Sequence, residues 1–403
     1  MSSPPPTAQT FASARRRNLS RLLTLVHREG AQSRAALTRR TGLNRSTIAG
    51  LVGELDALGL VTESGPTASA GVGRPSPLVT AAPSVVALTV NPDIDAVTVG
   101  LVGLGGVVHK RVRYPVTGTL RADEAVNLMA ALVEGMRSEL DSRFRVLGVG
   151  VAVPGLVERS TGTVTLAPHL RWRDEPFAAR ITAATGYRCV VANDARAAMV
   201  AELWFGAGRD RANLVYLNGS ASGIGGGVVS GREPLVGRHG FAGELGHTVV
   251  NPYGAACHCG RTGCLETEVT RSGLLRTLGL DDASPETLGV ALRTAVALDA
   301  VGRSDVMVEV DRQVGWLAQA IADVVNVLDP DRVVLGGFLA DLAAASGSGL
   351  TDRVRGTGFA ALSTPGLEIV PAALGADLLL IGAAELIFSA LLADPQTHPA
   401  LAS

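Results

Sequence analysis

The segment that decides the fold runs Gly243-Glu244-Leu245-Gly246-His247 and continues, after a turn-rich spacer, into Cys257-His258-Cys259-Gly260-Arg261-Thr262-Gly263-Cys264-Leu265-Glu266. Three of the chain's four cysteines fall within eight consecutive positions, and a histidine lies ten positions before the first of them. Thiolates and imidazole suit Zn²⁺, and four protein ligands leave no position for a reactive water. The spacing therefore predicts a structural zinc site with the ligands His247, Cys257, Cys259 and Cys264.

Two other interpretations of these cysteines exist. They could pair as a disulfide or lie as free core thiols, as we expect of Cys189 beside Tyr187 and Val190. A secreted disulfide scaffold would, however, carry a signal peptide and cysteines spread along the chain. His258 competes with His247 as the fourth ligand, but it would have to bend back between two other ligands.

The two motifs, GELGH and CHCGRTGCLE, resemble the signature of the ROK family, the repressors, open reading frames and sugar kinases that share an actin-like domain. The resemblance extends from about Val85 to the final helix. It implies that zinc holds the cysteine loop against a sugar pocket, and that the glutamates of both motifs bind sugar hydroxyls. The sugar ligands implied here are Glu244 and Glu266, with His247 serving both zinc and sugar.

The charge of the chain is unevenly distributed. The net charge is −1 over 403 residues, yet residues 1–80 contain ten arginines, no lysine and four acidic residues, a net charge of +6. A basic first fifth joined to an acidic remainder indicates a nucleic-acid-binding unit attached to a sensor or enzyme. No apolar run reaches the ~20 residues that span a bilayer, and no secretory signal is evident. We therefore expect a cytoplasmic protein without membrane contact.

The first 80 residues predict a small DNA-binding domain. Residues 1–14 are rich in proline and small residues and predict a disordered lead-in. Within residues 15–80, apolar spacing predicts one helix ending at Gly30, a second capped by Ser33, and a third capped by Asn44 or Ser46. This order, with a glycine turn at Gly42, is the helix-turn-helix pattern. An ordinary three-helix bundle with solvated arginines is the alternative.

A hairpin wing is expected after the third helix. The stretch from Thr62 to Val79 is rich in glycine, proline and serine, and Gly73-Arg74-Pro75 could place a guanidinium in a minor groove. A plain linker would have a similar composition. The resemblance favours the wing, because regulators of this family commonly carry a winged helix-turn-helix. The residues predicted to contact DNA are Arg34, Asn44, Arg45, Ser46, Thr47 and Arg74.

Residues 85–403 predict a two-lobed body. Three valine-rich strand candidates, a helix at about 122–144 and a buried strand begin one lobe, and a second set begins near Leu214. The predicted fold class is α/β: a winged helix-turn-helix joined to an actin-like, ribonuclease H-like domain of the sugar-kinase type with a structural zinc knuckle. Lobe one should cover about 85–205 plus the C-terminal helix, and lobe two about 212–375.

One pair of residues stands where a sugar hydroxyl could be bound. Asn193-Asp194 follows a strand and opens a helix, so Asp194 could accept a hydroxyl proton, or it could only cap the helix. The resemblance favours a sugar contact, because the Asn-Asp pair matches the family's sugar-binding and catalytic position. His169 could also reach the ligand, although a surface loop histidine is the favoured interpretation.

The first phosphate-binding turn of the family's kinases is missing. Where they show Asp-x-Gly-Gly-Thr, this chain has Thr89-Val90-Asn91-Pro92-Asp93. Without glycines the backbone cannot approach a phosphate closely, and proline lacks an N–H donor. Gly223, Gly225, Gly226 and Gly227, and the pair Gly336-Gly337, resemble the later loops but could serve packing alone. We therefore expect no kinase activity, with Asp194 as a vestigial base.

These features together predict a sugar-responsive transcriptional regulator, most simply a repressor of carbohydrate genes. Its partners would be an operator duplex and a sugar or sugar derivative, and twofold operators imply a homodimer or homotetramer. The alternative is an ATP-dependent hexose kinase of the same family. A third possibility is a regulator that has lost sugar binding and responds to a protein.

Overall fold

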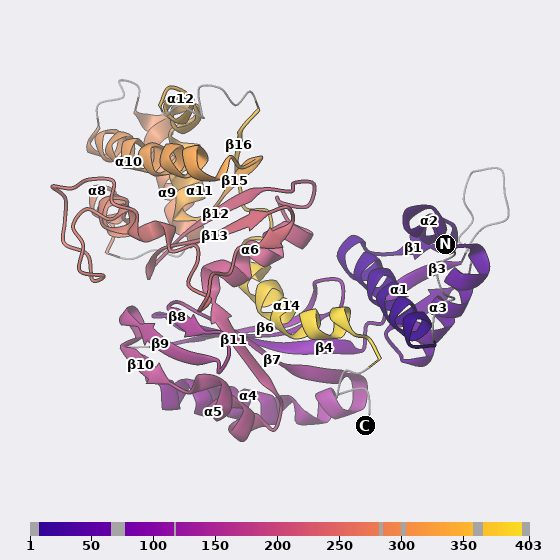
Figure 1. The fold of residues 1–403 in the computed structure, drawn as a ribbon. Helices are drawn as coiled ribbons and strands as arrows, with labels where there is room; N and C mark the ends of the chain where they lie inside the picture. Colours follow the sequence, from indigo (N-terminus) through magenta and orange to yellow (C-terminus); the bar gives the residue numbers. More distant parts are fainter. Residues whose placement is uncertain are drawn as a thin grey trace.

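The structure is a computed structural model that describes residues 8–65, 77–116, 118–281, 285–299, 304–357 and 366–396. Figure 1 shows a small N-terminal unit beside two larger lobes. We call the described part of residues 8–81 the head. Lobe one is built on a five-stranded sheet of order β11-β7-β4-β5-β6, and lobe two on a five-stranded sheet of order β14-β13-β12-β15-β16.

The head consists of three helices and a three-stranded antiparallel sheet of order β1-β3-β2. Ser33 Oγ accepts from Ala36 N–H at 3.1 Å, and Asn44 Oδ1 accepts from Thr47 N–H at 2.8 Å, so two helices begin at the predicted caps. The turn between them uses Gly42 at φ 74°. The elements are α1 (Ala8–Glu29), β1 (Gln32–Ser33), α2 (Arg34–Thr41), α3 (Arg45–Ala57), β2 (Val61–Ser64) and β3 (Leu78–Ala81).

The expectation of a disordered segment through residue 14 is wrong, because α1 begins at Ala8. The segment between Ala8 and Ala14 contains no proline or glycine, so nothing in it prevents the helix from extending toward the N-terminus.

At the other end of the head, β2 and β3 pair from Val61↔Ala81 to Ser64↔Leu78. Arg74 and the rest of residues 66–76 lie outside the described residues.

Lobe one has the strand-strand-strand-helix-strand order predicted from its valine-rich periodicity. Strands β4, β7 and β11 are parallel, β5 is antiparallel to β4, β6 is antiparallel to β5, and β8, β9 and β10 form a separate small sheet. The elements are β4 (Val85–Pro92), β5 (Ala96–Gly103), β6 (Val107–Pro115), α4 (Ala122–Arg143), β7 (Arg145–Val153), β8 (Leu156–Glu158), β9 (Thr163–Ala167), η1 (Pro168–Leu170), β10 (Trp172–Glu175), α5 (Phe177–Thr185), β11 (Cys189–Asn193) and α6 (Asp194–Phe205).

Lobe two also has a mixed sheet. In it β12, β15 and β16 are parallel, β13 is antiparallel to β12, and β14 is antiparallel to β13. Its long helix α10 buries an apolar stripe against this lobe's core. The elements are β12 (Leu214–Ser220), β13 (Gly223–Ser230), β14 (Glu233–Pro234), η2 (Leu245–His247), α7 (Leu265–Glu268), α8 (Arg271–Thr277), α9 (Pro285–Leu298), α10 (Asp305–Leu328), β15 (Arg332–Gly337), α11 (Phe338–Ala345), α12 (Gly349–Arg355), β16 (Glu368–Pro371), η3 (Gly375–Asp377) and α14 (Leu378–Ala393).

Helix α14 returns from lobe two to lie on the sheet of lobe one beside α6 (Figure 1). The contacts are close: a Cβ on Gly150 would lie 1.9 Å from the carbonyl oxygen of Ala383, and one on Gly382 would lie 2.2 Å from that of Ala197. The segment Gly375–Ala393 has a mean hydropathy of 2.0 and is long enough to cross a membrane, but 61% of it is buried inside the protein. Its apolar composition is that of a core helix.

The head is attached to lobe one by specific polar contacts. His27 is buried and its Nε2 lies 2.9 Å from Glu385 Oε1 on α14, while its Nδ1 accepts the N–H of Gly105 at 2.9 Å. Because Nδ1 is an acceptor, Nε2 carries the proton and donates it to the carboxylate. The Arg145 guanidinium donates to the carbonyl of Leu58 and to that of the following glycine, both at 3.0 Å. These contacts fix the position of the head relative to lobe one and α14.

Candidate functional site

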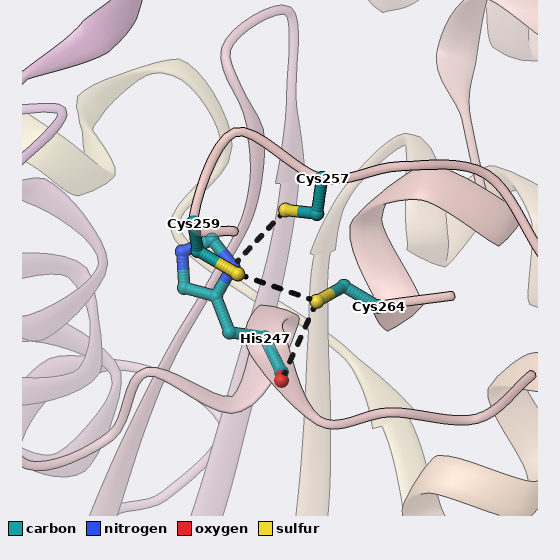
Figure 2. Close-up of side chains that lie close together, drawn as sticks. All are labelled: His247, Cys257, Cys259 and Cys264. Atoms are coloured by element: carbon teal, nitrogen blue, oxygen red, sulfur yellow. Dashed lines mark hydrogen bonds between the residues drawn. The ribbon is translucent and has the colours of Figure 1, made fainter. Parts of the chain in front are cut away.

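The four residues predicted as zinc ligands converge on one point in lobe two (Figure 2). Their ligand atoms all lie within 4.8 Å of one another. Cys257 Sγ lies 3.6 Å from His247 Nδ1, and Cys259 Sγ lies 3.6 Å from Cys264 Sγ. With Zn–S bonds of about 2.3 Å, the edge of a tetrahedron between two sulfurs is about 3.8 Å long. The donor set and its spacing therefore fit a tetrahedral zinc ion.

The loop that carries the cysteines is folded back on itself by two positive-φ glycines. Gly260 has φ 89° and Gly263 has φ 70°, and a Cβ on Gly263 would overlap the carbonyl oxygen of Asn251. The Cys257 N–H donates to the Arg261 carbonyl at 2.8 Å and closes the turn. The two glycines thus allow both ends of the loop to reach one point.

The candidate zinc site adjoins a set of acidic side chains. Glu266 Oε1 lies 3.0 Å from Cys257 Sγ, 3.3 Å from His247 Nδ1 and 3.2 Å from His258 Nδ1. Burial raises the pKa of Cys257, so without a cation this thiol stays protonated and donates to the carboxylate. A second group of possible ligands, His247, His258 and Glu266, shares this corner. His258 therefore lies beside the predicted site, while the Cys3His group is completed by His247.

Glu244 and Asp194 face the same region from opposite lobes. The surrounding protein and the charge of Glu266 raise the pKa of Glu244, although more than a third of Glu244 stays accessible to solvent. Asp194 is buried at the start of α6, and burial, the charge of Asp93 and the charge of Glu244 raise its pKa to about 7. These carboxylates meet where Asn193 and Asp194 of lobe one approach η2 and α7 of lobe two.

Asn193 and Asp194 are held by backbone contacts at the N-terminus of α6. Asn193 Oδ1 accepts from Arg196 N–H at 3.0 Å and its amide donates to the Gly155 carbonyl at 3.1 Å, so Asn193 is the cap of the helix. Asp194 Oδ1 accepts from Ala195 N–H at 2.7 Å. Asn193 therefore caps the helix. Asp194 Oδ2 accepts no hydrogen bond from the residues that the structure describes.

Asp93 belongs to this acidic set and was missed by sequence reasoning. It follows β4 directly, and its Oδ1 accepts from Ile94 N–H at 2.8 Å and from Ser222 Oγ at 2.9 Å. Ser222 lies in the β12–β13 turn, so this bond joins the two lobes. Burial raises the pKa of Asp93, and its charge raises that of Asp194. Its position after a strand was the available signal, because ligands in α/β folds gather at such strand ends.

His169 is exposed in the η1 turn, in line with the favoured interpretation of a surface loop histidine, but its ring also contacts another histidine. Its ring makes an edge contact with His258 at 5.6 Å between centroids, and His258 makes another with His247 at 5.1 Å. Burial lowers the pKa of His169, followed by the charge of His258. The η1 turn thus brings a lobe-one histidine to the zinc-binding corner.

The segment that stands where the family's kinases have a phosphate-binding turn is part of a strand. β4 remains an extended strand through Asn91 and Pro92, and the Asn91 amide donates to the Ala152 carbonyl at 3.0 Å. The later glycines serve packing: a Cβ on Gly225 would lie 2.6 Å from that of Ala195, and one on Gly227 would lie 2.6 Å from Met199 Sδ.

Apart from Arg74, which lies outside the described residues, the residues predicted to contact DNA lie at the start of α2 and α3. Asn44, Arg45 and Ser46 are exposed, and Thr47 is half-buried. Asn44 Oδ1 already accepts from Thr47 N–H and from Ser46 Oγ, both at 2.8 Å, which leaves only its amide group for another partner. Arg34 pairs with Glu63 of β2. Arg45 is therefore the most available of the described set.

Comparisons with known proteins agree with this architecture. A xylose repressor of Caldicellulosiruptor bescii is 27% identical over 332 residues, 75% of this chain and 78% of the repressor. A glucokinase of Halalkalibacterium halodurans is 32% identical over 276 residues, 65% of this chain and 82% of the kinase. The crystal structure of a ROK family transcriptional regulator, a homologue of the E. coli Mlc protein, superposes with a TM-score of 0.74 at 26% identity and covers 94% of this chain and 97% of its own. The family model described as "ROK family" matches residues 93–390, about three quarters of the chain, and the chain belongs to this family.

Proposed function

We propose that the protein is a DNA-binding transcriptional regulator, a repressor of carbohydrate-metabolism genes whose operator binding is modulated by a sugar or sugar derivative. One observation carries the proposal: the regulator structure matches 94% of the chain, head included, whereas the crystal structure of a ROK family glucokinase from Streptomyces griseus matches 75%. A head with a basic N-terminal region would be of no use to a kinase acting on a small sugar.

The head serves as a winged helix-turn-helix. Helix α3 would enter the major groove, with Arg45 and Ser46 of its first turn at the base edges and Arg34 near the backbone. Strands β2 and β3 would form the base of the wing, and Arg74 would lie at its tip. Two-fold operators are bound by paired heads, so the protein would act as a homodimer or a homotetramer in the cytoplasm.

The acidic set between the lobes would bind the sugar. Asn193, Asp194, Glu244, His247 and Glu266 present the acceptors that sugar hydroxyls need, and Asp93 and His169 extend the set. Because these residues come from both lobes, a bound sugar would favour one relative position of the lobes. A sugar that binds the two positions unequally would shift the population of heads able to bind the operator.

The structural zinc would be held by His247, Cys257, Cys259 and Cys264. When bound, the ion supplies no reactive water, because four protein ligands fill its coordination. It would fix the loop between Cys257 and Glu266, and with it the Glu266 carboxylate that faces the sugar. The absence of a glycine turn after β4 argues against phosphoryl transfer, which needs backbone donors close to the phosphates.

A mobility-shift assay on the gene's own upstream region, with and without a panel of sugars, tests the proposal. We expect a specific complex whose affinity changes with one sugar. A coupled ATPase assay with the same sugars tests the kinase alternative. Turnover at about 1 s⁻¹ or faster, which is the range of ordinary enzymes, would overturn the regulatory proposal.

A further inference from the structure

A cavity of about 410 Å³ lies where the head meets the end of α6 and lobe two, apart from the acidic set. This volume falls within the range of small-molecule sites. Arg28 and Glu29 of α1 and Arg40 of α2 line it from the head, and Trp204, Arg209 and Arg232 line it from the body. The cavity therefore exists only while the head sits on the body.

The lining of this cavity is strongly basic. It contains four guanidinium groups and one carboxylate, Glu29, whose Oε1 accepts from Arg40 Nη2 at 2.6 Å. Burial lowers the pKa of Arg28; the charge of Glu385 opposes this, the charge of Arg232 lowers the pKa further, and Glu233 has a smaller opposing effect. Arg209 is exposed at the rim. Like charges collected in a partly buried cavity are unfavourable until an anion enters.

Two of these arginines are fixed in place. The Arg28 guanidinium carbon lies 3.2 Å from the centroid of the Trp204 ring, and that of Arg232 lies 4.9 Å from it. Arg232 Nη1 also donates to the carbonyls of Arg209 and Arg211, each at 3.0 Å. The Arg28 Nε is buried and meets no hydrogen-bond acceptor in the described part of the chain. A buried donor without an acceptor is costly.

We propose that this cavity binds the phosphate group of a small molecule, either free phosphate or a phosphorylated sugar. Guanidinium groups bind phosphate through paired, charge-assisted hydrogen bonds, and the Trp204 ring holds two of them side by side. The acidic set between the lobes would repel the same anion. The two sites therefore select ligands of different charge, a neutral sugar between the lobes and a phosphate beneath the head.

Because the ligand would contact α1 and α2 together with α6 and the β13–β14 turn, it would tie the head to the body. Binding at this cavity requires neither an operator nor a sugar between the lobes. Its effect on DNA binding would follow only if the head binds DNA as proposed, so the two ideas can fail separately.

Titration calorimetry of the full chain with inorganic phosphate and with glucose 6-phosphate, at constant ionic strength, tests the proposal. We expect saturable binding of one or both. Arg209→Gln, at the exposed rim, should weaken it by about tenfold or more, which is the loss of one charged hydrogen bond. Arg28→Gln should weaken it similarly. Arg137→Gln, which changes an arginine of α4 outside the cavity, and Asp194→Asn should leave it unchanged.

Several outcomes would overturn the site. Absence of binding at about 10 mM phosphate or sugar phosphate would do so, as this is well above the Kd of a specific ligand of this class. An equal loss in Arg137→Gln, or equal displacement by chloride, would show non-specific attraction. Loss in Asp194→Asn alone would place the ligand between the lobes. Tighter binding of glucose 6-phosphate than of inorganic phosphate would identify the sugar phosphate as the ligand.

Discussion

Replacing Asp194 by asparagine should stabilise the protein and make its stability less sensitive to pH. Asparagine has nearly the same shape, and its side-chain oxygen can still accept from Ala195 N–H, as Asp194 Oδ1 does at 2.7 Å. Only the titratable proton is removed. The variant therefore isolates the cost of placing a charge at the buried N-terminus of α6, beside the Asp93 and Glu244 carboxylates.

The magnitude follows from the pKa of Asp194, which burial and the neighbouring carboxylates raise from 3.8 to about 7. An acid with a higher pKa in the folded state binds more protons when folded, so unfolding free energy falls as pH rises through the interval between the two pKa values. Ionisation of Asp194 lowers the unfolding free energy by nothing below the lower pKa and by about 4 kcal/mol above the upper one. Between about pH 6 and pH 8.5, the unfolding free energy should fall by about 1.4 kcal/mol for this reason.

The assay is urea unfolding of wild type and Asp194→Asn in parallel, at about pH 6 and about pH 8.5. We expect the variant to be the more stable protein at both values, with an advantage that grows by about 1.4 kcal/mol toward the higher pH. Asp95→Asn is the matched control, because Asp95 is an exposed aspartate paired with Arg113 at the protein surface. Its stability curve should run parallel to that of the wild type, since exposed ion pairs contribute little.

An advantage that does not change with pH, or a variant less stable than wild type at both values, would refute the reasoning. The first result would mean that Asp194 does not titrate in this interval. The second would mean that its carboxylate is stabilised by a partner, and that the proposed empty acceptor for a sugar hydroxyl is already occupied.

Three further predictions concern the metal, the DNA and the seat of the head. We expect atomic emission to find about one zinc ion per chain in the wild type and none in Cys264→Ser. Cys189→Ser, at a buried thiol of lobe one, should keep its zinc. Full zinc content in Cys264→Ser would contradict the ligand set. Arg45→Ala should weaken operator binding by about 1 to 3 kcal/mol in an anisotropy titration if Arg45 reads a base, and an equal loss on unrelated DNA would show that it contacts only phosphate. His27→Ala should lower the unfolding free energy by about 3 to 5 kcal/mol, because it leaves the buried Glu385 carboxylate without its partner; the double variant with Glu385→Leu should recover most of this, and a loss below about 1 kcal/mol in the single variant would show that the pair is dispensable.

The parts of the structure that were predicted well depend on short stretches of sequence. The strands from Val85 to Pro115 follow from their valine-rich periodicity, and the helix caps at Ser33 and Asn44 follow from hydrogen bonds within three residues. The four candidate zinc ligands fall within eighteen positions, so the loop that joins them also brings them together.

The parts that were missed depend on contacts between distant segments. Asp93 gains its role only when the β12–β13 turn of lobe two delivers Ser222 to it, and His169 only when η1 reaches His258. The cavity beneath the head needs Arg28, Trp204 and Arg232 in one place. Short sequence patterns do not predict contacts between segments that lie so far apart in the chain. The start of α1 was misjudged for a different reason, since a composition rich in small residues looks irregular although it is compatible with a helix.

The position of α14 has a consequence for how the protein is made. About 185 residues separate the end of β11 from the start of α14. At a synthesis rate of about 5 to 20 residues per second, one face of the lobe-one sheet therefore stays uncovered for about 10 to 40 seconds before α14 is made. His27, synthesised near the beginning, waits even longer for Glu385. A nascent chain therefore carries its head unanchored until α14 has been synthesised, and only chains that have folded through α14 hold the head in its native place.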